Sequence, residues 1–134
     1  MTPRLLAAAA GALGGLLLAI AGGSSFLARE SAGWHDALAF VGYAAIVAAL
    51  SIIGYGLVAQ APVWLRAIVS VAVPLLGASV WQVVAQTIDD RVDGWKGPAT
   101  THLLGGLVAL VVALVAFRRA DRDRAGGYAP THHR

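Results

Sequence analysis

The sequence contains no cysteine and few charged residues. The lack of cysteine excludes disulfide bonds, a thiol nucleophile and thiolate metal sites. Only 13% of the 134 residues are charged, whereas hydrophobic residues make up 58%. Soluble domains carry about 25% charged residues, and a soluble fold of this length could not cover so much apolar surface. The composition therefore predicts a membrane protein.

Four long stretches lack Asp, Glu, Lys and Arg altogether: 5–28, 37–65, 67–88 and 97–117. Each reaches the roughly 20 residues that a helix needs to cross about 30 Å of hydrocarbon. We therefore predict an all-α integral membrane protein, folded as an antiparallel four-helix transmembrane bundle. The expected helices are 5–27, 37–58, 65–88 and 99–117, so that residues 1–117 form one transmembrane domain. Residues 118–134 are expected to form a basic, disordered cytoplasmic tail.

The first uncharged stretch must be distinguished from a cleaved signal peptide. Ala19-Ile20-Ala21 offers a small-x-small cleavage site, which would remove residues 1–21. The stretch runs for 24 residues, however, which is longer than the apolar region of a signal peptide, about 7 to 15 residues. We expect a retained helix, and cleavage is the alternative.

Basic residues indicate the orientation. The formal net charge is +3, and five of the nine arginines (118, 119, 122, 124 and 134) follow the last apolar stretch. This position predicts a juxtamembrane anchor rather than a nucleic-acid partner. With the N-terminus inside, seven arginines lie on the cytoplasmic side, against Arg29, Arg91 and Lys96 on the other side. Both termini are therefore predicted to be cytoplasmic. Arginine outnumbers lysine nine to one and Ala, Gly and Val are abundant, a composition that favours a bacterial plasma membrane.

Small residues recur every fourth position along the first predicted helix: Ala7, Gly11, Gly15, Ala19 and Gly23. Removing side chains from one stripe lets another backbone approach closely, which favours helix association in a membrane. The last predicted helix has a stripe of its own at Gly105, Ala109 and Ala113. We expect helix packing at Gly11, Gly15, Gly105 and Ala109, either within the chain or against another chain.

Polar residues gather in the second half of the third predicted helix and at the start of the fourth. At about 100° per residue, the side chains of Ser79, Gln82, Gln86, Asp89 and Asp90 share one face, which leaves Trp81 pointing away toward lipid. Together with His102, and with His35 and Asp36 of the first outer loop, they could bind a polar head group or a cation. The competing interpretation is structural: glutamines pair across helices, and aspartates are solvated at helix ends. The tentative binding cluster is Gln82, Gln86, Asp89, Asp90 and His102.

The sequence lacks the motifs of common enzymes. It contains no GxSxG, P-loop, HExxH, EF-hand loop or dinucleotide-binding glycine fingerprint. No charged residue lies within the core of any predicted span, which weighs against ion-coupled transport by a single chain. We expect no cofactor, no metal and no enzymatic activity. The leading hypothesis is an accessory or structural subunit that packs with itself or with a larger membrane protein. The alternative is an oligomeric transporter or channel for a small solute, with the polar face of the third helix lining the path.

Overall fold

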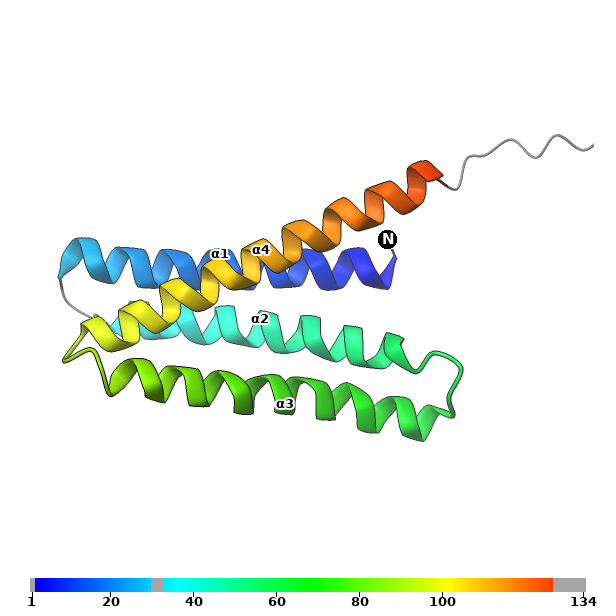
Figure 1. Cartoon of the computed structure of the whole chain (residues 1–134), viewed down its shortest axis with the longest axis horizontal. Coiled ribbons are helices and arrows are strands. Elements are labelled where there is room, and N and C mark those ends of the chain that lie inside the picture. Colours follow the sequence, from blue (N-terminus) through cyan, green and yellow to red (C-terminus); the bar gives the residue numbers. More distant parts are fainter. Residues whose placement is uncertain (1, 30–32, 127–134) are drawn as a thin grey trace, which may run out of the picture.

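The chain folds into four long helices. The computed structural model describes residues 2–29 and 33–126, which form α1 (Pro3–Ala28), α2 (Gly33–Leu57), α3 (Val63–Asp89) and α4 (Lys96–Gly126). Short connections make consecutive helices antiparallel (Figure 1). Each helix is long and apolar enough to cross a membrane. The prediction of an all-helical chain with four such helices is confirmed.

The start of α2 differs from the prediction. Trp34, His35 and Asp36, which we expected in a solvated loop, form the first turn of the helix. His35 is only 2% exposed, and its ring lies 3.8 Å from that of Trp34, centroid to centroid. An acidic side chain in a first turn favours a helix because it interacts with the positive end of the helix dipole. Asp36 therefore explains why α2 begins four residues before the predicted Ala37.

The end of α4 also differs. The helix continues past Phe117 to Gly126, so residues 118–126 are helical rather than disordered. Alanine and arginine are good helix formers, and they account for six of the nine residues from 118 to 126. The rest of the predicted tail, residues 127–134, lies outside the described residues.

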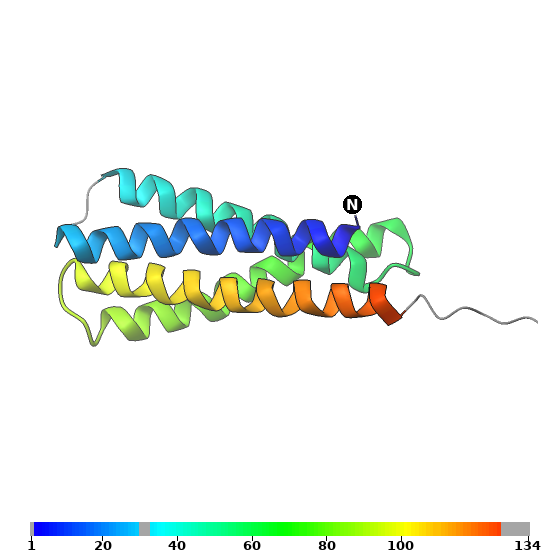
Figure 2. The ribbon, with the colours of Figure 1, turned by 90° about the horizontal axis from the view of Figure 1, so that it is seen from above.

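The helix α1 occupies the centre of the bundle. It packs against α2 on one side and against α4 on the other, whereas α3 packs mainly against α2 (Figures 1 and 2). Leu18 of α1 is fully buried and forms a core cluster with Ala21 of the same helix and Ala39 of α2. Within α3, which the structure describes in full, only Pro74 is buried.

Glycine allows the close approach of α1 to its two neighbours. Gly14 lies against Gly42 of α2, and the next residue, Gly15, lies against Gly106 and Ala109 of α4. About two turns further on, a Cβ atom placed on Gly22 would lie 2.5 Å from the Leu103 amide nitrogen. Because these neighbours are backbone atoms, a side chain could not be accommodated without separating the helices.

The expected four-residue stripe describes this packing only in part. Gly15 lies at a helix contact, and an ideal Cβ on Gly11 would be 3.9 Å from the Cβ of Ala49. An ideal Cβ on Gly23 would meet nothing within 4 Å. The buried positions instead include three pairs of small residues seven apart: Ala7-Ala8, Gly14-Gly15 and Ala21-Gly22. A seven-residue period keeps the same two faces of a helix toward its neighbours over several turns.

The turns are fixed by single residues. Arg66 of α3 donates from Nε to the Ala61 carbonyl at 2.9 Å and also to the Ala59 carbonyl, and its guanidinium lies 5.7 Å from the centre of the Tyr55 ring. These contacts satisfy carbonyl groups in the α2–α3 turn. In the α3–α4 turn, Gly94 has a φ of 69°, in the left-handed region that favours glycine.

Neighbouring glycines of α1 provide a test of this packing. We expect Gly22→Ala to lower the free energy of unfolding by about 1 to 3 kcal/mol, because the new methyl group overlaps the α4 backbone. Gly23→Ala should leave it unchanged or raise it by up to about 1 kcal/mol, the gain in helix propensity. Reversible unfolding in mixed detergent micelles measures both values, and equal effects of the two variants would contradict the contact.

Candidate functional site

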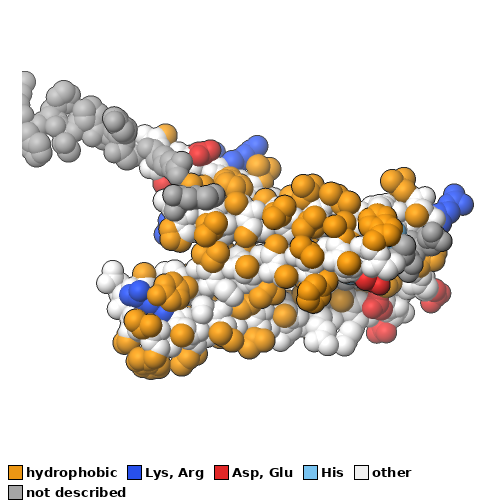
Figure 3. Space-filling model, turned by 180° about the vertical axis from the view of Figure 1, so that it is seen from behind, with side chains coloured by type: hydrophobic (Ala, Val, Ile, Leu, Met, Phe, Trp, Pro, Cys, Tyr) orange, Lys and Arg blue, Asp and Glu red, His pale blue; other side chains and the backbone are white. Residues whose placement is uncertain are grey.

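A cleft of about 790 Å³ opens between α3 and α4. The two helices meet at the short turn that joins them and diverge toward their other ends (Figure 1). Helices α1 and α2 form the floor of the cleft. Figure 3 shows the resulting notch at the end of the molecule that holds the α2–α3 turn. The volume lies within the range of small-molecule sites, about 300 to 1,000 Å³.

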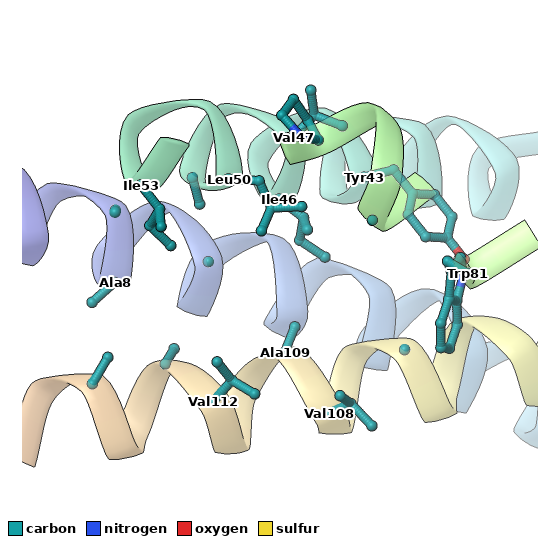
Figure 4. A pocket seen from close by; sticks show the side chains of 18 of the residues that line it. Ala8, Tyr43, Ile46, Val47, Leu50, Ile53, Trp81, Val108, Ala109 and Val112 are labelled. Atoms are coloured by element: carbon teal, nitrogen blue, oxygen red, sulfur yellow. The ribbon is translucent and has the colours of Figure 1, made fainter. Parts of the chain in front are cut away.

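The walls of the cleft are apolar and built largely from small residues. All four helices contribute glycine or alanine, among them Gly11, Ala49, Gly77, Ala78, Ala109 and Ala113. Between them lie aliphatic side chains such as Ile46, Leu50, Val108 and Val112 (Figure 4). Pro74 of α3, which is buried, also lies on this surface. The small residues create the space, and the aliphatic ones make it suitable for a hydrocarbon chain.

A hydrogen-bonded triad closes one end of the cleft. The Trp81 indole N–H donates to the Tyr43 hydroxyl at 3.2 Å, and that hydroxyl lies 3.2 Å from Nδ1 of His102. Tyr43 and Trp81 point toward each other at this end (Figure 4). The Trp81 ring lies against Gly105, where an ideal Cβ would be 2.7 Å from it. The triad thus joins α2, α3 and α4.

The triad contains more polar hydrogens than it uses. With a neutral imidazole, Trp81, Tyr43 and His102 carry three polar hydrogens, and the two hydrogen bonds use two of them. If Tyr43 donates to His102, the remaining hydrogen is on Nε2 of the imidazole; if His102 donates, it is on the Tyr43 hydroxyl. Either arrangement leaves one donor at the closed end of the cleft.

Acidic side chains flank His102 on the side of the short turns. Asp36 in the first turn of α2 and Asp89 at the end of α3 are the carboxylates that interact with its imidazole. The Asp89 carboxyl also lies against Gly97 in the first turn of α4, 2.7 Å from an ideal Cβ. Both aspartates are exposed. These two carboxylates therefore lie beyond the closed end of the cleft and do not line it.

Charged residues line the other end. Arg4 at the start of α1, and Arg119 and Asp123 in the last turns of α4, form the mouth of the cleft. All three are exposed. The cleft therefore has an apolar body, a closed end with hydrogen-bonding groups and a charged mouth.

The predicted polar cluster is only partly assembled. Gln82 lines the cleft, whereas Gln86, Asp89 and Asp90 are exposed and lie outside it. Neither glutamine side chain forms a hydrogen bond with another residue in the described part of the chain. His102 bonds to Tyr43 instead of facing the glutamines. Among residues 2–29 and 33–126, no three His, Asp or Glu side chains gather closely enough to hold a metal ion.

The expected orientation of Trp81 is wrong. We placed this side chain toward lipid, but it points into the bundle and bonds to Tyr43. The indole N–H needs an acceptor in apolar surroundings, and Gly105 leaves room for the ring against α4. The sequence analysis also missed Tyr43 as a site residue, because its partner Trp81 lies on another helix. The signal that could have found it was an aromatic residue with a polar hydroxyl in the middle of an apolar stretch.

The predicted packing positions Gly11, Gly105 and Ala109 all line this cleft.

Comparison with protein families, curated proteins and solved structures gives no match for this chain. Function must therefore be argued from the chemistry of the cleft.

The triad can be tested by removing one oxygen atom. Tyr43→Phe keeps the ring but leaves the Trp81 N–H and His102 Nδ1 without their shared partner, so we expect a loss of about 1 to 3 kcal/mol in the free energy of unfolding. Tyr55→Phe is the matched control, because the Tyr55 ring under Arg66 is kept. We expect a change within about 0.5 kcal/mol for the control. Similar small losses in the free energy of unfolding for both variants would show that the triad does not stabilise the fold.

Proposed function

We propose that this chain is a non-enzymatic, multi-pass protein of a bacterial plasma membrane, with both termini in the cytoplasm. Four apolar helices support membrane insertion. Large hydrophobic side chains are exposed on the outer face of α3, including Ile68, Val71 and Leu75, where they would face lipid. The excess of arginine at the end that holds both termini supports the orientation.

The orientation predicts which positions are accessible from outside the cell. The chain has no native cysteine, so single cysteines can be introduced at Asp93 and at Asp121. A membrane-impermeant maleimide should label Asp93→Cys in intact cells, because this residue lies in the α3–α4 turn. Asp121→Cys should be labelled only after permeabilisation. The opposite pattern would show that the termini lie outside.

We further propose that the cleft between α3 and α4 holds the chain of a membrane lipid. One observation carries this proposal: the cleft is apolar along its length, open at the charged mouth and closed by Trp81 at the other end. Binding sites for small molecules combine apolar walls with a few placed polar groups in this way. A hydrocarbon chain matches the walls, and its polar head would remain at the mouth.

The length of the cleft favours a lipid over a transmembrane helix. Phe117 ends the last uncharged stretch, 12 residues from Gly105, which corresponds to about 18 Å along α4. One leaflet contributes about 15 Å of hydrocarbon. A partner helix has to cross about 30 Å, but the contact between Trp81 and Gly105 closes the cleft before that depth. The cleft therefore suits a chain that enters from one leaflet.

Within this proposal, the chain packs with another copy of itself or with a larger membrane protein, as an accessory or structural subunit. The small-residue stripe of α1 is not a suitable contact surface, because Gly15 packs against α4 inside the bundle. The outer face of α3 is available. A solute path along α3 has less support, because Gln86 and Asp90 lie outside the cleft.

Filling the cleft tests lipid binding. Ala78 lies on the α3 wall of the cleft and is exposed, whereas Ala72 is exposed on the outer face of the same helix. We expect native mass spectrometry of the purified protein to detect a retained phospholipid in the original chain and in Ala72→Phe. Ala78→Phe should lose most of the bound phospholipid, because the new ring occupies the space of the acyl chain.

A second variant, on the other wall of the cleft, tests whether the loss of lipid is due only to a local packing defect at residue 78. Ala116 lies on the opposite wall, on α4, and is exposed, so Ala116→Phe should cause the same loss. Unfolding of each variant in detergent should show that the bundle remains intact. Full retention of lipid in both Ala78→Phe and Ala116→Phe would refute the proposal.

A further inference from the structure

We propose that the lipid in this cleft is an anionic phospholipid of the leaflet next to the termini, with its phosphate bound between Arg4 and Arg119. This inference rests on the proposed lipid-holding function and specifies the head group. The two arginines come from opposite ends of the chain, the start of α1 and the last turns of α4, yet they line the same mouth.

Both guanidinium groups are available for a ligand. Each arginine is exposed, and in the described part of the chain neither guanidinium group forms a salt bridge or a hydrogen bond, even with Asp123 at the same mouth. A guanidinium presents a planar fork of donors that matches two phosphate oxygens. Two such forks at the mouth of an apolar cleft provide the charge that an anionic head group requires.

Other basic residues at this end are not equivalent. Arg66 uses its guanidinium to close the α2–α3 turn and to cover the Tyr55 ring. Arg118 and Arg122 are exposed on α4 but do not line the cleft. Any preference for an anionic lipid that arises in the cleft should therefore depend on Arg4 and Arg119 in particular, whereas a general attraction to an anionic surface would depend on all of them.

The depth of the two arginines suits a phospholipid. Arg4 immediately precedes the first uncharged stretch, and Arg119 lies two residues after the end of the last one at Phe117. Both therefore lie at the level of the head groups when the uncharged stretches span the hydrocarbon. From this level, an acyl chain would run past Ala116 and Val112 toward Trp81, along side chains that line the cleft.

Asp123 gives the proposal a directional test. Its carboxylate shares the mouth with the two arginines and opposes an anionic head group. Asp123→Asn should strengthen binding of an anionic lipid without affecting a zwitterionic one. This increase is not expected if the arginines only anchor the helix ends.

The experiment compares two lipids with the same acyl chains. The full chain is incubated with equal amounts of phosphatidylglycerol and phosphatidylcholine, and native mass spectrometry measures the ratio of the two complexes. We expect about a fivefold preference for phosphatidylglycerol, the effect of one net positive charge at a membrane surface. Arg4→Gln combined with Arg119→Gln should abolish the preference, and Asp123→Asn should increase it.

The matched control combines Arg118→Gln with Arg122→Gln, which removes the same charge from the same end of the bundle. This control should keep most of the preference. Equal loss in both double variants, or no loss in Arg4→Gln with Arg119→Gln, would overturn the head-group site. Retention of both lipids in a ratio near one would also overturn it while leaving the lipid-holding function intact. Failure of the original chain to retain either lipid would refute the proposed function itself.

Discussion

The close approach of α1 and α4 is the constraint on which the rest of the structure depends. Gly15 and Gly22 of α1 meet α4 backbone at Gly106 and Leu103, where no side chain fits. Backbones that approach this closely over several turns make extensive van der Waals contact, the kind of packing that drives helix association in membranes. Because Gly14 brings α2 equally close on another face, α1 becomes the centre of the bundle.

This central position of α1 leaves α3 at the edge. Its close contacts are with α2, where Gly54 lies against the Val69 carbonyl, and it meets α4 chiefly near their common turn. The result is a wedge rather than a closed four-helix bundle. The cleft between α3 and α4 therefore follows from unequal packing. Glycine contacts hold α1 to α2, α1 to α4 and α2 to α3, whereas α3 meets α4 chiefly near their common turn and at the contact of Trp81 with Gly105.

The sequence predicted the four helices because uncharged stretches long enough to span a membrane are a strong physical signal. It did not predict how they pack. Abundant small residues suggested a period of four, although the buried pairs Ala7-Ala8, Gly14-Gly15 and Ala21-Gly22 repeat every seven residues. The site was harder to predict, because the helical periodicity of one segment shows which residues share a face but not which side chains of other helices they contact. Gln82 was expected in a binding cluster and does line the cleft, but Trp81 was placed on the wrong side, since its partner Tyr43 lies 38 residues away.

The polar groups of this chain are arranged so that none has to be charged within the apolar body of the cleft. Trp81, Tyr43 and His102 share neutral hydrogen bonds at the closed end, and the charges of Asp36 and Asp89 lie beyond them. A buried polar group left without a partner costs about 1 to 3 kcal/mol. The triad is therefore stable only while α2, α3 and α4 converge there, and this convergence is what stops the cleft. The same three residues that satisfy each other therefore also determine that the cleft is open at one end only.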